Sequence, residues 1–157
     1  MSQVRFGFIG AGAIAVTSAH SVNKHEHASV VAIQDLNCGR ATQLAKDLNI
    51  PKVYNTAEEL FADPGIDAVY IAVPNKFHVE LTIKALNAGK HVILEKPFAM
   101  NYQEALQAVE TARKAGKVLT LGMNQRFVDS VQRTKALVEQ GALGEIYHAK
   151  AFWFRRT

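Results

Sequence analysis

Short apolar segments alternate with helix-patterned segments along most of the chain, and this alternation limits the fold more than any other feature. The apolar segments are VRFGFIG (4–10), ASVVAIQD (28–35), KVY (52–54), IDAVYIAVP (66–74), KHVILEKP (90–97) and KVLTLGM (117–123). Helices are predicted between and after them, over 12–25, 39–50, 56–63, 76–89, 101–116 and 130–144. Strands that are apolar throughout are buried on both faces. The pattern therefore predicts an α/β fold with a doubly wound parallel sheet and helices on each side.

The bulk composition excludes several classes of protein. Hydrophobic residues make up 48% of the 157 residues and the net charge is +4, which are values typical of a globular chain. No Lys/Arg run exceeds two residues, so a nucleic-acid footprint is not indicated, and no apolar run is long enough to cross a membrane. The single cysteine, Cys38, fits a reducing cytoplasm. The histidines show no metal-ligand spacing, so no metal site is predicted.

The turn after the first strand carries a glycine motif. Gly10, Gly12 and Ala15 follow the order G-x-G-x-x-A between a predicted strand and a predicted helix. Asp35 comes 20 residues after Ala15 and ends the second strand. In dinucleotide-binding turns the first glycine allows the tight turn, the second admits the pyrophosphate, and the small third residue lets helix and strand pack closely. The motif predicts a dinucleotide site.

Asp35 bears on which dinucleotide binds. A carboxylate at this position accepts hydrogen bonds from the adenosine ribose and repels the 2′-phosphate of NADP, so NAD is the predicted cofactor. Arg40 leaves NADP open, because an arginine five residues on reaches a phosphate if the chain bends suitably. We favour the interpretation of Arg40 as a solvated helix residue, and keep it among the candidates.

A lysine stands at the end of an otherwise apolar strand. Glu95 and Lys96 follow Val92–Leu94 directly and precede Pro97. Ligands of doubly wound sheets bind at the carboxyl ends of the strands, which places Lys96 at the mouth of the crevice. We also expect the Lys96–Pro97 peptide to be a candidate for the cis form, because the strand must end sharply there. The predicted cofactor residues at this edge are Gly10, Ala11, Gly12, Ala13, Ile14, Asp35, Arg40, Val73, Pro74, Asn75, His78, Glu95, Lys96, Asn124 and Arg126.

These motifs together resemble the glucose–fructose oxidoreductase and inositol dehydrogenase family. The resemblance rests on GFIGAGAIA, Asp35, AVPNKFHVELTIKALNAGKHVILEKP and LVEQGALGEI, and runs from residue 4 to about 150. It implies a Rossmann domain and an NAD(P)-dependent oxidoreductase acting on a sugar, cyclitol or related polyol. It also implies that Lys96 is catalytic and bonds the reacting substrate oxygen. Structural roles compete with the functional ones for His78, as a helix-start residue bonded to backbone, and for Arg126, as a residue that pins the domain junction.

The family's catalytic base is a histidine in an Asp-x-x-x-His motif of a second domain, and this sequence has no such motif after residue 122. We expect residues 1–122 to form the dinucleotide-binding domain. Residues 123–157 are then the beginning of a truncated α+β substrate and oligomerisation domain, and the chain is either a piece of a longer protein or a natural short form. In a longer protein we expect the sheet of that second domain to form a homo-oligomer. The segment from Glu145 alternates as a strand, with Tyr147, Ala149, Ala151 and Trp153 on one face. Two other functions remain open, an NAD-sensing module without turnover and an oligomerisation fragment.

Overall fold

The structure is a computed structural model that describes residues 3–152, and the chain divides into two compact units at Gly122–Met123. In the described part of unit 1, six strands form one sheet in the order β3-β2-β1-β4-β5-β6, and every neighbouring pair is parallel. The strands are β1 (Val4–Ile9), β2 (Ala28–Gln34), β3 (Lys52–Tyr54), β4 (Ala68–Ile71), β5 (His91–Leu94) and β6 (Leu119–Leu121). The predicted doubly wound sheet is confirmed.

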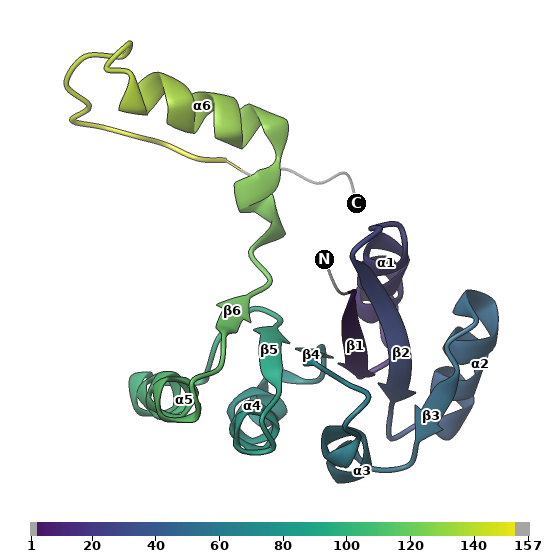
Figure 1. The fold of residues 1–157 in the computed structure, drawn as a ribbon. Helices are drawn as coiled ribbons and strands as arrows, with labels where there is room; N and C mark the ends of the chain where they lie inside the picture. The colour runs from purple at the N-terminus through teal and green to yellow at the C-terminus, as the bar shows by residue number, and fades with distance from the viewer. Residues whose placement is uncertain (1–2, 153–157) are drawn as a thin grey trace. The chain divides into compact units, whose positions relative to one another are not determined.

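Five helices flank this sheet (Figure 1): α1 (Ala13–Asn23), α2 (Cys38–Leu48), α3 (Ala57–Ala62), α4 (His78–Asn87) and α5 (Tyr102–Ala115). Capping residues mark where some of these helices begin and end. Thr56 and Glu59 form a capping box at the start of α3, and Gly116 ends α5 in the left-handed conformation. A 3₁₀ turn, η1 (Asn75–Phe77), precedes α4.

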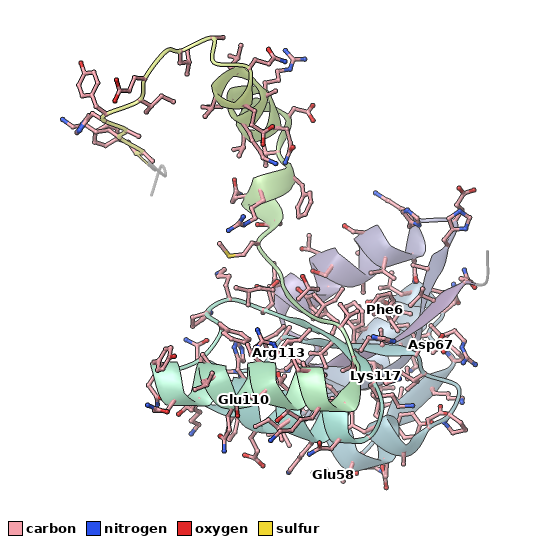
Figure 2. The ribbon with its side chains drawn as sticks, turned by 60° about the vertical axis from the view of Figure 1, so that its left-hand side comes forward. Phe6, Glu58, Asp67, Glu110, Arg113 and Lys117 are labelled. Atoms are coloured by element: carbon pink, nitrogen blue, oxygen red, sulfur yellow. The ribbon has the colours of Figure 1, made fainter. Side chains whose placement is uncertain are left out.

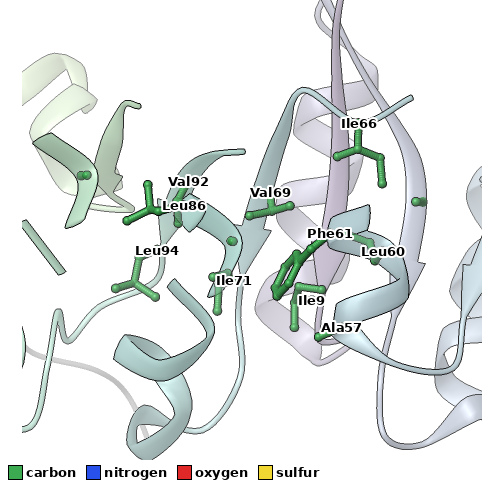
Figure 3. Packing of buried hydrophobic residues seen from close by; sticks show 13 residues of the cluster. Ile9, Ala57, Leu60, Phe61, Ile66, Val69, Ile71, Leu86, Val92 and Leu94 are labelled. Carbon is green, nitrogen blue, oxygen red and sulfur yellow. The ribbon is translucent and has the colours of Figure 1, made fainter. Parts of the chain in front are cut away.

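Two apolar clusters, one on each face, hold the sheet between the helices. On one face Phe8, Ile33 and Tyr70 pack with small residues of α1 and α2, including Ala15, which is fully buried. On the other face β1, β4 and β5 pack against α3, α4 and α5 (Figure 3), through residues that include Ile9, Leu60, Phe61, Val69, Ile71, Leu86 and Leu94. Burial of this apolar area is the main force that holds the fold.

Unit 2, taken by itself, contains η2 (Asn124–Phe127) and α6 (Asp129–Glu139). The strand predicted from Glu145 is wrong for residues 145–152, where the described chain has no regular structure. A strand needs a hydrogen-bonded neighbour, and the described part of unit 2 contains no strand to pair with. Trp153, which was expected on the same strand face, lies outside the described residues.

The carboxylates of Asp63 and Asp67 hold the chain near the amino end of β4. The Asp63 carboxylate accepts hydrogen bonds from Lys52 (2.6 Å), the Tyr54 hydroxyl (2.8 Å) and the Gly65 backbone (2.7 Å). These contacts lower the pKa of Asp63 to about 2, chiefly through Lys52. Asp67, labelled in Figure 2, forms a bidentate pair with Arg5 that lowers its pKa to about 2 as well. Both carboxylates therefore stabilise the folded state in their ionised forms.

Because these pKa values lie below the usual 3.8, the stabilisation is complete above about pH 4 and is lost as the pH falls towards 2. Asp63→Asn should lower the free energy of unfolding at pH 7 by about 1–2 kcal/mol and flatten its decline between pH 4 and 2. Urea unfolding at a series of pH values measures both effects. The exposed Asp47→Asn is the control, and an Asp63→Asn curve parallel to the wild type through this range would contradict the account.

Candidate functional site

A cavity of about 590 Å³ opens at the carboxyl ends of β1, β2 and β4. In the sheet β1 lies between β2 and β4, so the chain leaves this edge in opposite directions on the two sides of β1. Such a switch point is where ligands of doubly wound sheets bind. The cavity is lined by Ile9, Gly10, Gly12, Gln34, Asp35, Leu36, Arg40, Asn55, Thr56, Ala57, Glu58, Ala72, Val73, Pro74, Phe77, Glu80 and Leu81.

The glycine turn supplies the floor of this cavity. Gly10 has a φ of +97°, and a Cβ there would lie 2.3 Å from the Ala72 carbonyl oxygen, so only glycine fits between β1 and the end of β4. Gly12 is the N-cap of α1, and a Cβ there would meet nothing within 4 Å. Ala13 and Ile14 follow as exposed first-turn residues. The turn therefore leaves the N-terminus of α1 accessible from the cavity.

Asp35 joins the second strand to the glycine turn. It is buried, and its carboxylate accepts hydrogen bonds from the Ala11 backbone N–H (2.7 Å), the Asn37 backbone N–H (2.7 Å) and the Arg40 guanidinium (3.0 Å). Burial raises the pKa of the carboxyl group, but these three donors outweigh it and the pKa lies below its usual value. Asp35 is therefore an anion that both fixes the turn and faces the cavity.

Arg40 only partly matches the interpretation that we favoured from the sequence, a solvated helix residue. Its side chain is more than half exposed, but its guanidinium pairs with Asp35 and it lines the cavity. The N-cap residue Asn37 fixes the start of α2 by accepting from the Arg40 backbone N–H, which sets the arginine one turn from the carboxylate. The spacing in the sequence alone did not indicate that Arg40 and Asp35 form an ion pair.

The end of β4 divides the predicted residues into two groups. Val73 and Pro74 line the cavity, whereas Asn75 begins the exposed turn η1. His78 is buried, and its Nδ1 lies 2.7 Å from the Pro97 carbonyl oxygen while its Nε2 lies 2.9 Å from the Val73 carbonyl oxygen. Both ring nitrogens therefore lie within hydrogen-bond distance of a backbone carbonyl oxygen, one after each of two neighbouring strands. The geometry supports the structural role of His78, as a clamp between two strand ends.

Lys96 lies in the segment that directly follows β5. The Glu95 backbone N–H donates to the Ile71 carbonyl, which continues the pairing of β5 with β4, and the Lys96 side chain is exposed. The Lys96–Pro97 peptide is cis, as expected from the sequence. The half-buried Glu95 carboxylate accepts from the Lys96 backbone N–H (3.2 Å) and from the Tyr70 hydroxyl (2.5 Å). Neither Lys96 nor Glu95 lines the cavity itself; they lie at the neighbouring strand end.

Some site residues were not foreseen and others remain predictions. Asn55, Thr56 and Glu58 form a wall of the cavity that the sequence analysis missed, although Asn55 directly follows β3 and so lies at the same sheet edge. Asn124 and Arg126 belong to η2 in unit 2, and their place in the cofactor site stays a prediction. Within residues 3–152, no cluster of three or more His, Cys, Asp or Glu could hold a metal, and no helix has the length and hydropathy to span a membrane.

Comparison with known proteins gives consistent matches. The chain is 33% identical over 142 residues to a myo-inositol 2-dehydrogenase of Thermotoga maritima, covering 90% of this chain and 42% of that one. It is 36% identical over 157 residues to a D-glucoside 3-dehydrogenase of Escherichia coli, covering 99% and 44%. The crystal structure of scyllo-inositol dehydrogenase from Lactobacillus casei with bound NAD(H) and scyllo-inositol superposes with a TM-score of 0.86 at 29% identity, covering 92% and 43%.

The chain thus spans less than half the length of the relatives that it matches. The model of one family, described as an oxidoreductase family with an NAD-binding Rossmann fold, matches residues 4–123. That match covers the whole sheet and every residue of the glycine turn, and it confirms the resemblance carried by the motifs. This chain belongs to the oxidoreductase family with an NAD-binding Rossmann fold.

Proposed function

We propose that this chain is the cofactor-binding part of an NAD-dependent dehydrogenase that acts on a sugar, cyclitol or related polyol. The observation that carries the proposal is the placement of a buried anion and an exposed cation on one edge of the sheet. Asp35 lies in the cavity at the end of β2, and Lys96 follows β5, whose partner β4 bounds the same cavity. The three relatives compared above are named as dehydrogenases of cyclitols or a sugar derivative, which supports the substrate class.

The residues of the cavity fit a dinucleotide. The open space at Gly12 admits a phosphate close to the backbone. The first turn of α1 has no acidic residue and its N-cap makes no side-chain hydrogen bond, so its backbone N–H groups are available to an anion. Asp35 suits the ribose hydroxyls, which donate to a carboxylate. Asn55, Thr56 and Glu58 then border the adenosine end.

Bound NAD supplies a hydride acceptor, and Lys96 supplies positive charge beside the substrate oxygen. When an alcohol carbon loses hydride, its hydroxyl group loses a proton and the oxygen gains negative charge on the way. An ammonium group held next to that oxygen stabilises the charge. The family resemblance assigns the proton to a histidine base in an Asp-x-x-x-His motif, and no such motif follows residue 122 in this sequence. A cytoplasmic location and a homo-oligomer formed through a second domain stay predictions.

Asp35 predicts a preference for one of the two cofactors. NAD should bind this chain about tenfold or more tightly than NADP, because the Asp35 carboxylate repels a 2′-phosphate. Asp35→Asn keeps the shape of the side chain and one acceptor oxygen but removes the negative charge. It should therefore reduce the difference in affinity between NAD and NADP, mainly by improving NADP binding. Isothermal titration calorimetry with both cofactors measures this, with Asp47→Asn on α2 as the matched control. Equal or tighter NADP binding by the wild type would instead show that Arg40 controls the pocket.

Turnover should differ between this chain and a two-domain form. The 157-residue chain should bind NAD without reducing it, whereas a two-domain form should oxidise at least one polyol from a panel of sugars and cyclitols. In that form Lys96→Met should lower kcat by about 10²–10⁴-fold, with cofactor affinity nearly unchanged, since the lysine acts on the substrate oxygen. The exposed Lys114→Met on α5 is the control. Normal kcat in Lys96→Met would remove Lys96 from the chemistry, and cofactor binding with no turnover of any substrate would favour an NAD-sensing module.

A further inference from the structure

We propose that Tyr70 is a positioning residue, which holds the Glu95 carboxylate and through it the backbone of Lys96. The inference rests on the proposed function, because it concerns how Lys96 is aimed. Tyr70 lies in the middle of the sheet, on β4, and is almost fully buried. Its ring stacks on Phe8 of β1 with centroids 4.7 Å apart. Packing therefore fixes the ring, and this holds its hydroxyl group in one position.

The hydroxyl group of Tyr70 lies between two side chains from different elements. It donates to Glu95 Oε1 at 2.5 Å, and the carboxylate oxygen accepts. A phenol has one proton, so the 2.8 Å contact with Ser18 Oγ has serine as the donor. Thr17 and Ser21, the neighbouring hydroxyl residues of α1, donate instead to carbonyl groups four residues earlier. Ser18 alone of these three reaches across to the sheet.

The protonation state of this chain of hydroxyl groups is fixed. Burial raises the pKa of the Tyr70 phenol, and the Glu95 carboxylate raises it further. The phenol thus remains a donor across the working pH range. A hydrogen bond to an ionised acceptor at this length is stronger than one between neutral groups. Tyr70 therefore restrains the carboxylate rather than merely filling space beside it.

The carboxylate of Glu95 is confined on the side of β6 as well. A Cβ at Gly122, just after β6, would lie 2.9 Å from Glu95 Oε1 and 3.4 Å from Cδ. The absence of a side chain there leaves the space that the carboxylate occupies. The second carboxylate oxygen, Oε2, accepts from the Lys96 backbone N–H at 3.2 Å. Glu95 therefore links Tyr70 to Lys96, because its carboxylate accepts from the Tyr70 hydroxyl group and from the Lys96 backbone N–H.

Lys96 is then held from both sides. Glu95 accepts from its backbone N–H, and His78 Nδ1 lies 2.7 Å from the carbonyl oxygen of the next residue, Pro97. The far end of the hydroxyl chain, Ser18, belongs to α1, whose N-terminus opens on the cavity. The contacts connect the cofactor helix to the lysine through buried or half-buried side chains. Catalytic groups need such support, since small displacements of a reacting group reduce rates strongly.

The alternative is that the Tyr70–Glu95 bond contributes stability alone. Tyr54 offers a matched control, because its hydroxyl group also donates to a carboxylate, that of Asp63, at 2.8 Å. Both Tyr→Phe changes remove one hydroxyl group and leave the ring. Only the Tyr70 change releases a carboxylate that bonds the Lys96 backbone. A difference between the two variants at Lys96 therefore reports positioning rather than general loss of stability.

The experiment has two readouts on Tyr70→Phe, Ser18→Ala, Gly122→Ala and Tyr54→Phe. The first is hydrogen exchange of the Lys96 amide by NMR in this chain, which should accelerate about tenfold in Tyr70→Phe and Gly122→Ala. In Ser18→Ala it should change less, since Tyr70 still donates to Glu95. The second is steady-state kinetics of the two-domain form, where Tyr70→Phe should lower kcat about tenfold with the dissociation constant for NAD unchanged within twofold. Tyr54→Phe should alter neither.

The outcomes separate this inference from the proposed function. Unchanged Lys96 amide exchange in Tyr70→Phe overturns the positioning role whatever the enzyme does. Faster exchange with normal kcat also overturns it, as does an equal fall of kcat in Tyr54→Phe. Failure of the wild-type chain to bind NAD, or normal turnover by Lys96→Met, overturns the proposed function instead. In either case the amide exchange still reports whether Tyr70 and Glu95 restrain Lys96.

Discussion

The hydrogen bond between the Asp35 carboxylate and the Ala11 backbone N–H, 2.7 Å long, joins the two strand ends on which the site depends. It holds the glycine turn against the end of β2, and Asp35 also accepts from Asn37 at the start of α2. A buried carboxylate without such donors would be costly, so the turn and the acid stabilise each other. The same carboxylate faces the cavity, which means that the group that fixes the local fold is also the group expected to select the cofactor.

A comparable arrangement supports the second half of the site. There the strand ends of β4 and β5 are joined by side chains, through Tyr70 to Glu95 and through His78 to Pro97, instead of by backbone pairing alone. Tyr70, which lies outside the predicted cofactor site, thus helps to hold the short segment that carries Lys96. Binding and chemistry are divided along one sheet edge, with the anion beside the glycine turn and the cation two strands away from β1.

The sequence predicted what depends on local pattern. The apolar runs predicted the strands, the G-x-G-x-x-A spacing predicted the close packing of Ala15 between helix and sheet, and the pattern over 56–63 predicted α3. It did not predict contacts that depend on side-chain direction across elements. Tyr70 is 25 residues from Glu95 and reads as one more apolar strand residue, and the Arg40 ion pair needs the bend at Asn37. The strand expected over 145–152 failed because alternation shows a preference for pairing and does not supply a partner.

The central claim, that the crevice at the carboxyl edge of β1, β2 and β4 binds NAD, is tested most directly by NMR titration of the isotope-labelled chain. The account predicts that the amide signals of Ala11, Gly12 and Asn37 shift most and saturate together at one dissociation constant, because their N–H groups border the glycine turn and the Asp35 carboxylate. Shifts confined instead to a second cavity, about 450 Å³ between α5 and β6 and lined by Phe98 and Val118, would contradict it.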